Sequence, residues 1–223
     1  MRRACGLYGE RGARHVAVGD AYSLWRGGPR SAFDRPRLWY MQTGRPRLVA
    51  PRAFSRTLCG GGAHISIAHD GGVLAVLVAG GSGVCGVGVD IVDLSRLRRR
   101  IESHRMLERF AGHIADGPAA RRLAADWKGR TLEGGRVEAG VRFALMEAVS
   151  KALGTGWTLG RSLGVGVPCK AIEIGRVQPA PQVTLKHPAV TVLRKTGGRR
   201  VRGLWIKSGD LIVAVAAVLR SGS

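Results

Sequence analysis

The sequence predicts an α+β protein of two pseudo-symmetric halves, each a small antiparallel sheet packed with helices. The prediction rests on two similar apolar hairpins and on a strongly periodic helix between them. The apolar strand of the first hairpin begins at Val73 and that of the second at Leu211, 138 residues later. Repetition of one unit along a chain is typical of two related halves. We expect an N-terminal half over residues 1–83 and a C-terminal half over residues 84–223.

Alternating and continuous apolar runs predict the strands. They are expected over residues 64–68, 73–79, 84–92, 171–174, 183–185, 204–207 and 211–219. Within the third of these, alternation places Val87 and Val89 on one face and Gly88 and Asp90 on the other. The first ~40 residues have too little periodicity to predict an element.

Helical periodicity predicts three helices between the two sets of strands. Asp93 and Ser95 are both suitable N-caps for the first helix, whose apolar side extends to Leu107 and whose other side is rich in arginine. A second, less regular helix is expected over residues 118–128. The third, over residues 141–153, has the clearest apolar stripe, and the Gly-Thr-Gly that follows should end it.

Composition and charge exclude several classes of protein. The 223 residues include 36 Lys and Arg but 15 Asp and Glu, so a net charge of +21 favours an anionic partner or substrate. The longest apolar run, residues 211–219, is far shorter than the roughly 20 residues that a membrane span needs. The N-terminus lacks the apolar core of a signal peptide. Four scattered cysteines without a CxxC pair fit reduced thiols, so we expect a cytoplasmic protein without a membrane segment.

Three residues are candidates for chemistry from their positions alone. Asp90 lies inside an apolar strand, where a lone carboxylate is costly, so it needs a metal ion, an arginine or a lysine beside it. Glu147 and Lys151 are four residues apart on one helix face, a spacing that is also ordinary for a surface ion pair. Phe143 on the same face favours a pocket wall. Taken alone, His69 and Arg45 are typical turn or surface residues.

Two stretches together resemble one family. Residues 86–93, GVGVDIVD, are similar to the GxGxDIxxI segment of 4′-phosphopantetheinyl transferases, and residues 143–156, FALMEAVSKALGTG, resemble their FxxKEAxxKALGTG signature. Gly44-Arg45-Pro46 and residues 65–71 are similar to the GKP and SxSH segments of the monomeric, double-length members. The resemblance covers residues 43–219 and indicates a holo-acyl-carrier-protein synthase-like enzyme that is a monomer.

The resemblance implies a reaction and a role for each matched residue. The 4′-phosphopantetheine group of coenzyme A would be transferred to a serine of an apo carrier protein, acyl or peptidyl, with release of 3′,5′-ADP. Asp90 and Glu147 would hold Mg²⁺ or Mn²⁺, and Glu147 and Lys151 would be catalytic. Arg45, His69 and Lys151 would bind coenzyme A.

The same resemblance implies a partner. Carrier proteins of this kind are acidic, so the arginine-rich helix over residues 96–105 is the expected docking surface.

Three departures from the family pattern leave alternatives open. Met146 stands where the family has lysine, which should remove a cation from the site. Ala68 replaces a serine before His69, and Val92 occupies the position of a second acidic ligand in many double-length members. One alternative is therefore a catalytically impaired relative that still binds carriers. The other, suggested by the net charge, is a nucleic-acid-binding protein, but no helix-turn-helix, zinc finger or aromatic RNA motif supports specific binding to nucleic acid.

Overall fold

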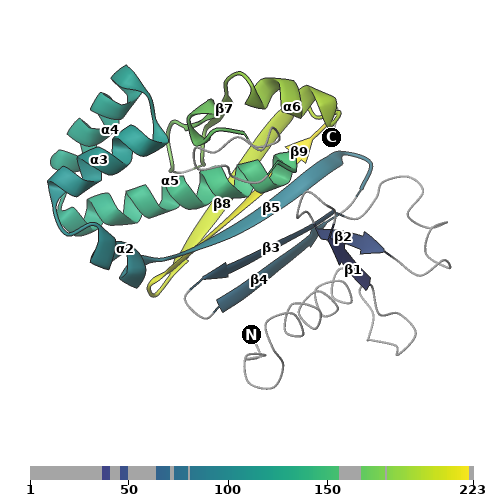
Figure 1. The fold of residues 1–223 in the computed structure, drawn as a ribbon, viewed down its shortest axis with the longest axis horizontal. Helices are drawn as coiled ribbons and strands as arrows, with labels where there is room; N and C mark the ends of the chain where they lie inside the picture. The colour runs from purple at the N-terminus through teal and green to yellow at the C-terminus, as the bar shows by residue number, and fades with distance from the viewer. Residues whose placement is uncertain are drawn as a thin grey trace.

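A computed structural model describes residues 37–40, 46–49, 64–70, 73–79, 81–155, 167–178 and 180–220. The strands are β1 (Arg37–Tyr40), β2 (Pro46–Val49), β3 (His64–Asp70), β4 (Val73–Ala79), β5 (Val84–Asp93), β6 (Ile172–Ile174), β7 (Val183–Leu185), β8 (Arg200–Ser208) and β9 (Leu211–Leu219). The helices are α2 (Leu94–Arg100), α3 (His104–Ile114), α4 (Gly117–Lys128), α5 (Leu132–Leu153) and α6 (Ala189–Lys195), with a 3₁₀ turn η2 (Cys169–Ala171). Small antiparallel sheets packed with helices confirm the predicted α+β class (Figure 1).

A three-stranded antiparallel sheet of order β5-β9-β8 organises the described part of the chain. Helix α5 covers one face of this sheet, and the β3–β4 hairpin lies beside β5 (Figure 1). Alternation along β5 separates the two contacts. Val92 packs in the core on the α5 side, whereas Val89 and Ile91 form a second cluster with Ala68 of β3. The predicted division of β5 into two faces is therefore confirmed.

Helix α5 lies unusually close to β5 because glycines face it. A Cβ atom built on Gly86 would lie 2.1 Å from the carbonyl oxygen of Ala152, and one on Gly88 would lie 1.8 Å from that of Ala148. No side chain fits at such separations, so the backbones themselves are in contact. This close approach brings the last turns of α5 within reach of Asp90, the next residue of β5 that faces the helix.

The free edge of β5 is satisfied by side chains of β3 rather than by a strand ladder. The amide of Val89 donates to Ser66 Oγ at 3.0 Å, and the amide of Asp93 donates to Asp70 Oδ2 at 2.9 Å. Both pairs are 23 residues apart, so β3 and β5 run in the same direction. Buried strand edges need such partners, because an unpaired amide costs free energy.

Helix boundaries differ from the sequence predictions in two places. Helix α5 begins at Leu132, nine residues before the expected start, with Thr131 as its N-cap. Glycines weaken the pattern in its first turns, and burial on nearly all sides leaves no long polar stripe to reveal the helix. The expected single helix up to Leu107 is two helices, because the chain leaves α2 at Ile101 and begins α3 after Ser103.

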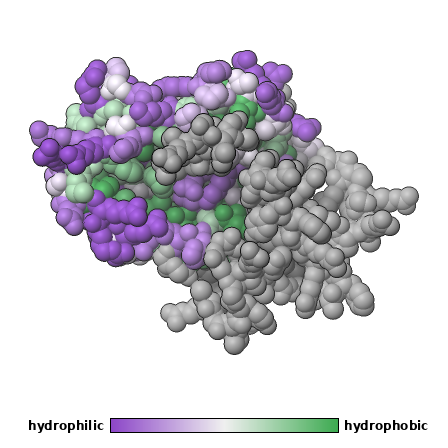
Figure 2. All heavy atoms as spheres, in the orientation of Figure 1, coloured by the Kyte–Doolittle hydropathy of each residue, from purple (hydrophilic) through white to green (hydrophobic). Residues whose placement is uncertain are grey.

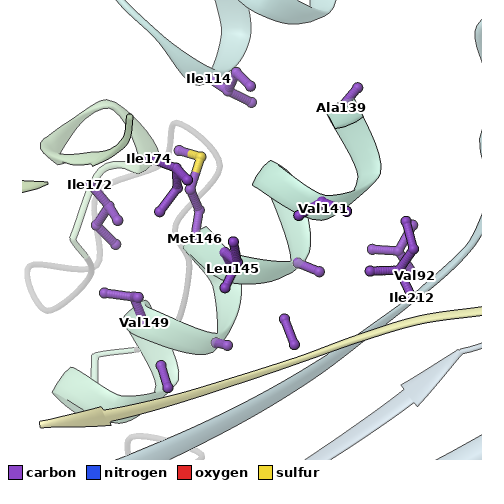
Figure 3. Close-up of a cluster of buried hydrophobic side chains, with 14 of the residues drawn as sticks. Val92, Ile114, Ala139, Val141, Leu145, Met146, Val149, Ile172, Ile174 and Ile212 are labelled. Carbon is purple, nitrogen blue, oxygen red and sulfur yellow. The ribbon is translucent and has the colours of Figure 1, made fainter. Parts of the chain in front are cut away.

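The far side of α5 packs against β6. Figure 3 shows Met146 and Val149 of α5 together with Ile172 and Ile174, all of them buried.

The division into two halves stays a prediction. Strands β1 to β4 are the described part of the expected N-terminal half. Among the described residues, no helix is both long enough and apolar enough to cross a membrane.

Gly88→Ala should destabilise the protein by about 3 kcal/mol or more, because the new methyl group would collide with the α5 backbone rather than with a flexible side chain. Gly112→Ala is the matched control, since a Cβ there meets nothing within 4 Å and alanine is favoured in helix α3. Urea unfolding followed by circular dichroism measures both variants. Equal stability of the Gly88 variant and the wild type would contradict the close approach.

Candidate functional site

The structure brings Asp90, Glu147 and Lys151 together between β5 and α5. Lys151 Nζ donates to Asp90 Oδ1 at 2.8 Å and to the carbonyl oxygen of Val89 at 3.1 Å. It also forms an ion pair with Glu147 Oε1 at 3.4 Å. The close glycine contact of β5 with α5 makes this possible, because it lets a side chain of the last helical turn reach across to the strand. The three residues are called the carboxylate–lysine cluster below.

Burial decides the electrostatics of the cluster. The Asp90 side chain is 7% exposed, whereas Glu147 and Lys151 are 26% and 24% exposed. Burial raises the pKa of Asp90 from 3.8 to about 7; the Lys151 ammonium opposes this rise and the Glu147 carboxylate adds to it. Within the described part of the chain, Asp90 Oδ2 is buried and has no hydrogen-bond partner. The cluster therefore has a buried acceptor oxygen to offer a cation.

The donor set of the cluster suits Mg²⁺. This ion prefers oxygen ligands and is commonly held by one or two carboxylates, with waters and substrate phosphates completing the shell. Asp90 and Glu147 contact the same ammonium group, so their carboxylates are close enough to share a cation. Over the described ranges there is no group of three or more His, Cys, Asp and Glu residues arranged to hold a metal. At a site with two carboxylates, waters and substrate phosphates commonly complete the shell of Mg²⁺.

Of the three residues expected to bind coenzyme A, Lys151 belongs to the carboxylate–lysine cluster. Arg45 lies outside the described residues. His69 is exposed near the end of β3, and strand alternation places it on the opposite face from Ser66 and Asp70, which contact β5. The role of both residues as ligands of coenzyme A stays a prediction.

Met146, the residue that stands where the family has lysine, packs away from the carboxylate–lysine cluster. It is 1% exposed and packs in the main core, and Figure 3 shows it pointing toward Ile174 and away from β5. Position 146 therefore faces β6 and a small pocket that Arg142 and Glu173 also line. The expectation that this methionine removes a cation from the site stays a prediction. Adjacent helix positions are 100° apart, which separates Met146 from Glu147.

A pocket of about 380 Å³ opens beside the cluster, between α2, α3 and α5. Phe143, one turn before Glu147, lines it together with Leu97 and Phe110, and the two aromatic rings lie 5.9 Å apart. The expectation that Phe143 belongs to a pocket wall is confirmed. Arg96, Arg100 and Arg109 also line this pocket, and all three are exposed. It is called the arginine-rimmed pocket below; on this side of the molecule, Figure 2 shows apolar residues between bands of hydrophilic ones.

The arginines of α2 do not all serve one surface. Arg98 donates to Glu133 at the start of α5 and pairs with Asp210 of the β8–β9 turn at 2.8 Å. It therefore fastens α2 to its neighbours. Arg105, which the sequence analysis assigned to the same helix, lies on α3.

Sequence analysis missed two residues near the cluster. Ser66 and Asp70 bond the free edge of β5, and each is buried. Their signal was the alternation of small or polar residues at 66, 68 and 70, but the predicted strand ended at residue 68, before Asp70.

Comparison with known proteins identifies the family. No family model matches the chain. The holo-[acyl-carrier-protein] synthase of Chlamydia muridarum is 37% identical over 109 residues, which are 48% of this chain and 75% of that protein. This chain belongs to the holo-[acyl-carrier-protein] synthase family. A second synthase, from Treponema denticola, is 29% identical over 119 residues, 53% of this chain and 84% of the synthase. The family lies within the 4′-phosphopantetheinyl transferase superfamily, as the sequence motifs predicted.

Solved structures of synthases are also similar to this chain. A synthase of Plasmodium yoelii with ADP bound has a TM-score of 0.48 and 22% identity, covering 62% of this chain and 97% of its own. The synthase of Neisseria meningitidis has a TM-score of 0.46 and 27% identity, covering 60% and 98%.

Asp90 should make the stability of the metal-free protein fall as the pH rises. Its folded-state pKa is higher than in the unfolded chain, so the folded state binds more protons between pH 3.8 and about 7. This contribution is fully present below pH 3.8 and is lost as the pH rises through about 7. The total is several kcal/mol at most, because each pKa unit corresponds to about 1.4 kcal/mol.

Urea unfolding in EDTA at pH 5, 6, 7 and 8 measures this contribution as a difference between wild type and Asp90→Asn. The stability of wild type relative to the variant should decrease from pH 5 to about pH 7 and level off by pH 8. A constant difference would show that Asp90 titrates as in the unfolded chain.

Proposed function

We propose that this chain transfers the 4′-phosphopantetheine group of coenzyme A to a serine of an apo carrier protein and releases 3′,5′-ADP. The observation that carries the proposal is the buried Asp90, which has one oxygen on Lys151 and one without a partner among the described residues. Membership of the synthase family supports it, since relatives are named for this activity. Cytoplasmic location and a monomeric, double-length architecture belong to the same proposal.

The reaction forms one bond and breaks one. The serine oxygen bonds to the phosphorus atom that carries pantetheine, and the bond from that phosphorus to the bridging oxygen of the pyrophosphate breaks. The electron pair of that bond leaves with 3′,5′-ADP, and the serine proton must go to a base. Glu147, partly exposed at the edge of the cluster, is the base we propose. Lys151, which pairs with Glu147, would offset negative charge on the phosphates.

Asp90 and Glu147 would hold Mg²⁺ or Mn²⁺, which supplies positive charge to the pyrophosphate oxygens when it is bound. In the metal-free protein the Lys151 ammonium lies between the same two carboxylates. When the ion is bound, Lys151 would share the two carboxylates with it, and some N–H donors of the ammonium group would become available to the phosphates of the coenzyme. Arg45 and His69 are the residues that we propose for its 3′-phosphate.

The arginine-rimmed pocket is the proposed docking surface for the carrier. An acidic carrier helix would bind the exposed arginines of the rim, and an apolar side chain of that helix would enter beside Phe143. This position leaves the carrier serine next to Glu147, because Phe143 and Glu147 are one helical turn apart. Arg98 is not part of this surface, since Glu133 and Asp210 already hold it.

Intact-mass spectrometry of apo carrier proteins with wild-type protein, coenzyme A and Mg²⁺ tests the proposal. One phosphopantetheinyl group should be added, and EDTA or replacement of the acceptor serine by alanine should prevent it. Acyl and peptidyl carriers are compared in the same assay. If carriers bind but none is modified at any metal concentration, the chain is an impaired relative and the proposed activity is wrong. Stoichiometric, sequence-specific capture of nucleic acid would instead support the nucleic-acid alternative.

Glu147→Gln should lower kcat by about 10²- to 10⁴-fold because it removes the proposed base without changing side-chain size. Asp90→Asn should lose most activity and require more Mg²⁺ to reach its residual rate. Glu173→Gln is the matched control. Glu173 lies on β6, across α5 from the cluster, and forms a partly exposed ion pair with Lys186. Wild-type turnover of the Glu147 variant would reject its role as a base.

Reversing the charge of one arginine on the rim should weaken binding of the carrier and leave binding of coenzyme A unchanged. Arg100→Glu is expected to raise KM for the carrier by about tenfold or more at low salt, and the effect should shrink as salt screens the charges. Arg121→Glu on α4 makes the same change in net charge on another exposed helix position. Steady-state kinetics at two salt concentrations measures both. Equal effects of the two variants would mean that net charge, and no particular surface, attracts the carrier.

A further inference from the structure

Asp70 links the β3–β4 hairpin to the start of helix α2. It is the last residue of β3 and is 6% exposed. Its Oδ2 atom accepts from the amide of Asp93, and its Oδ1 atom lies 2.9 Å from Arg96 Nη1. One buried carboxylate therefore contacts the N-cap residue of α2 and the first arginine of that helix.

Arg96 is held at one nitrogen and open elsewhere. Its side chain is 48% exposed although it pairs with Asp70. It also lines the arginine-rimmed pocket, together with Asp93 and Phe143. A guanidinium group has five N–H donors in a fixed plane, so one contact orients the group while others stay available for a second carboxylate.

Asp70 is well placed to orient rather than to be displaced. Its other oxygen accepts from the Asp93 amide, and this hydrogen bond holds the Asp70 carboxylate in place. Asp70 would therefore keep its position when a carrier binds to Arg96. Long side chains lose conformational freedom when they bind, and a side chain that is already ordered loses less. The pair therefore lowers the cost of binding an acidic partner at Arg96.

Asp70 could also weaken binding of an acidic partner, since it neutralises part of the charge of Arg96. Long-range attraction, however, depends on the whole charge of +21, of which one unit is a small share. At physiological salt, charges beyond about 8 Å are largely screened, so local orientation outweighs the added unit.

We infer that Asp70 is a positioning residue for the carrier: through its contact with Arg96, the β3–β4 hairpin aims one arginine of α2 at the acidic partner. This inference rests on the proposed function. It assigns to the N-terminal part of the chain a role in choosing the acceptor, separate from coenzyme binding.

A double-mutant cycle tests the inference with wild type, Asp70→Asn, Arg96→Gln and the double variant. Asparagine keeps an oxygen for the Asp93 amide and removes the charge that faces Arg96. Asp70→Asn should raise KM for an apo acyl carrier protein about three- to tenfold, the range for one partly exposed pair, with KM for coenzyme A unchanged. In the Arg96→Gln background the same change should have no further effect, because Asp70 acts through Arg96.

Asp116→Asn is the control for the change in charge. Asp116 forms an exposed ion pair with Lys170, away from the pocket, so its variant should leave KM for the carrier at the wild-type value. Equal effects of Asp70→Asn in both Arg96 backgrounds, or no effect in either, would overturn the inference.

Failure of the proposed function is distinguished by wild type itself, which would then modify no carrier. The positioning contact is in that case measured directly by hydrogen exchange over residues 93–100. Asp70→Ala removes both contacts and should speed exchange there relative to wild type, and Asp70→Asn should speed it less, because it keeps the Asp93 bond. Unchanged exchange in both variants would overturn the positioning role whatever the activity.

Discussion

The contact between Lys151 and the buried carboxylate of Asp90 depends on how closely α5 packs against β5, and much of the described structure serves that packing. Two glycines of β5 let the helix backbone touch the strand, which shortens the path from the last helical turn to the sheet. The edge of β5 that does not pair with β9 is held by hydrogen bonds to Ser66 and Asp70. The strand is therefore fixed from both sides at the point where the carboxylate must be kept in place. A charge in such surroundings is costly unless its partner is equally fixed.

Alternation along β5 places the residues that contact α5 on one face and those that contact the β3–β4 hairpin on the other. Residues that face α5 include Asp90 and Val92, and those that face away pack against the hairpin. A shift of one residue in this strand would exchange the two sets and bury a carboxylate among the apolar side chains of the hairpin. The pairing of Asp90 with Ala214 of β9 therefore matters as much to the site as the ion pair does. A small residue opposite the carboxylate leaves room for the helix side chains above it.

The sequence predicted the strands around the site well because each is a short apolar run bounded by turn residues. It also indicated that Asp90 needs a partner, since a lone carboxylate in an apolar strand is costly. Phe143 favoured a pocket wall, whereas the spacing of Glu147 and Lys151 was also ordinary for a surface ion pair. It did not predict the first turns of α5, because glycines there conceal the helical period. Nor could one-dimensional spacing indicate Ser66 and Asp70 as partners of β5, since their bonds join backbone amides 23 residues away. Alternation at 66, 68 and 70 marks one face of β3, but it does not indicate which strand that face contacts.

Met146 bears directly on whether the chain is an active enzyme. The hypothesis of lost catalysis rested chiefly on this residue, because a lysine beside the glutamate would add positive charge near the phosphates. Its side chain lies beside Ile172 and Ile174 and lines a small pocket that Arg142 and Glu173 also line. In this chain the methionine therefore belongs to the packing of α5 on β6. In the proposed function, Lys151, between both carboxylates, would supply positive charge to the phosphates, and the exposed arginines of the nearby pocket would bind the partner.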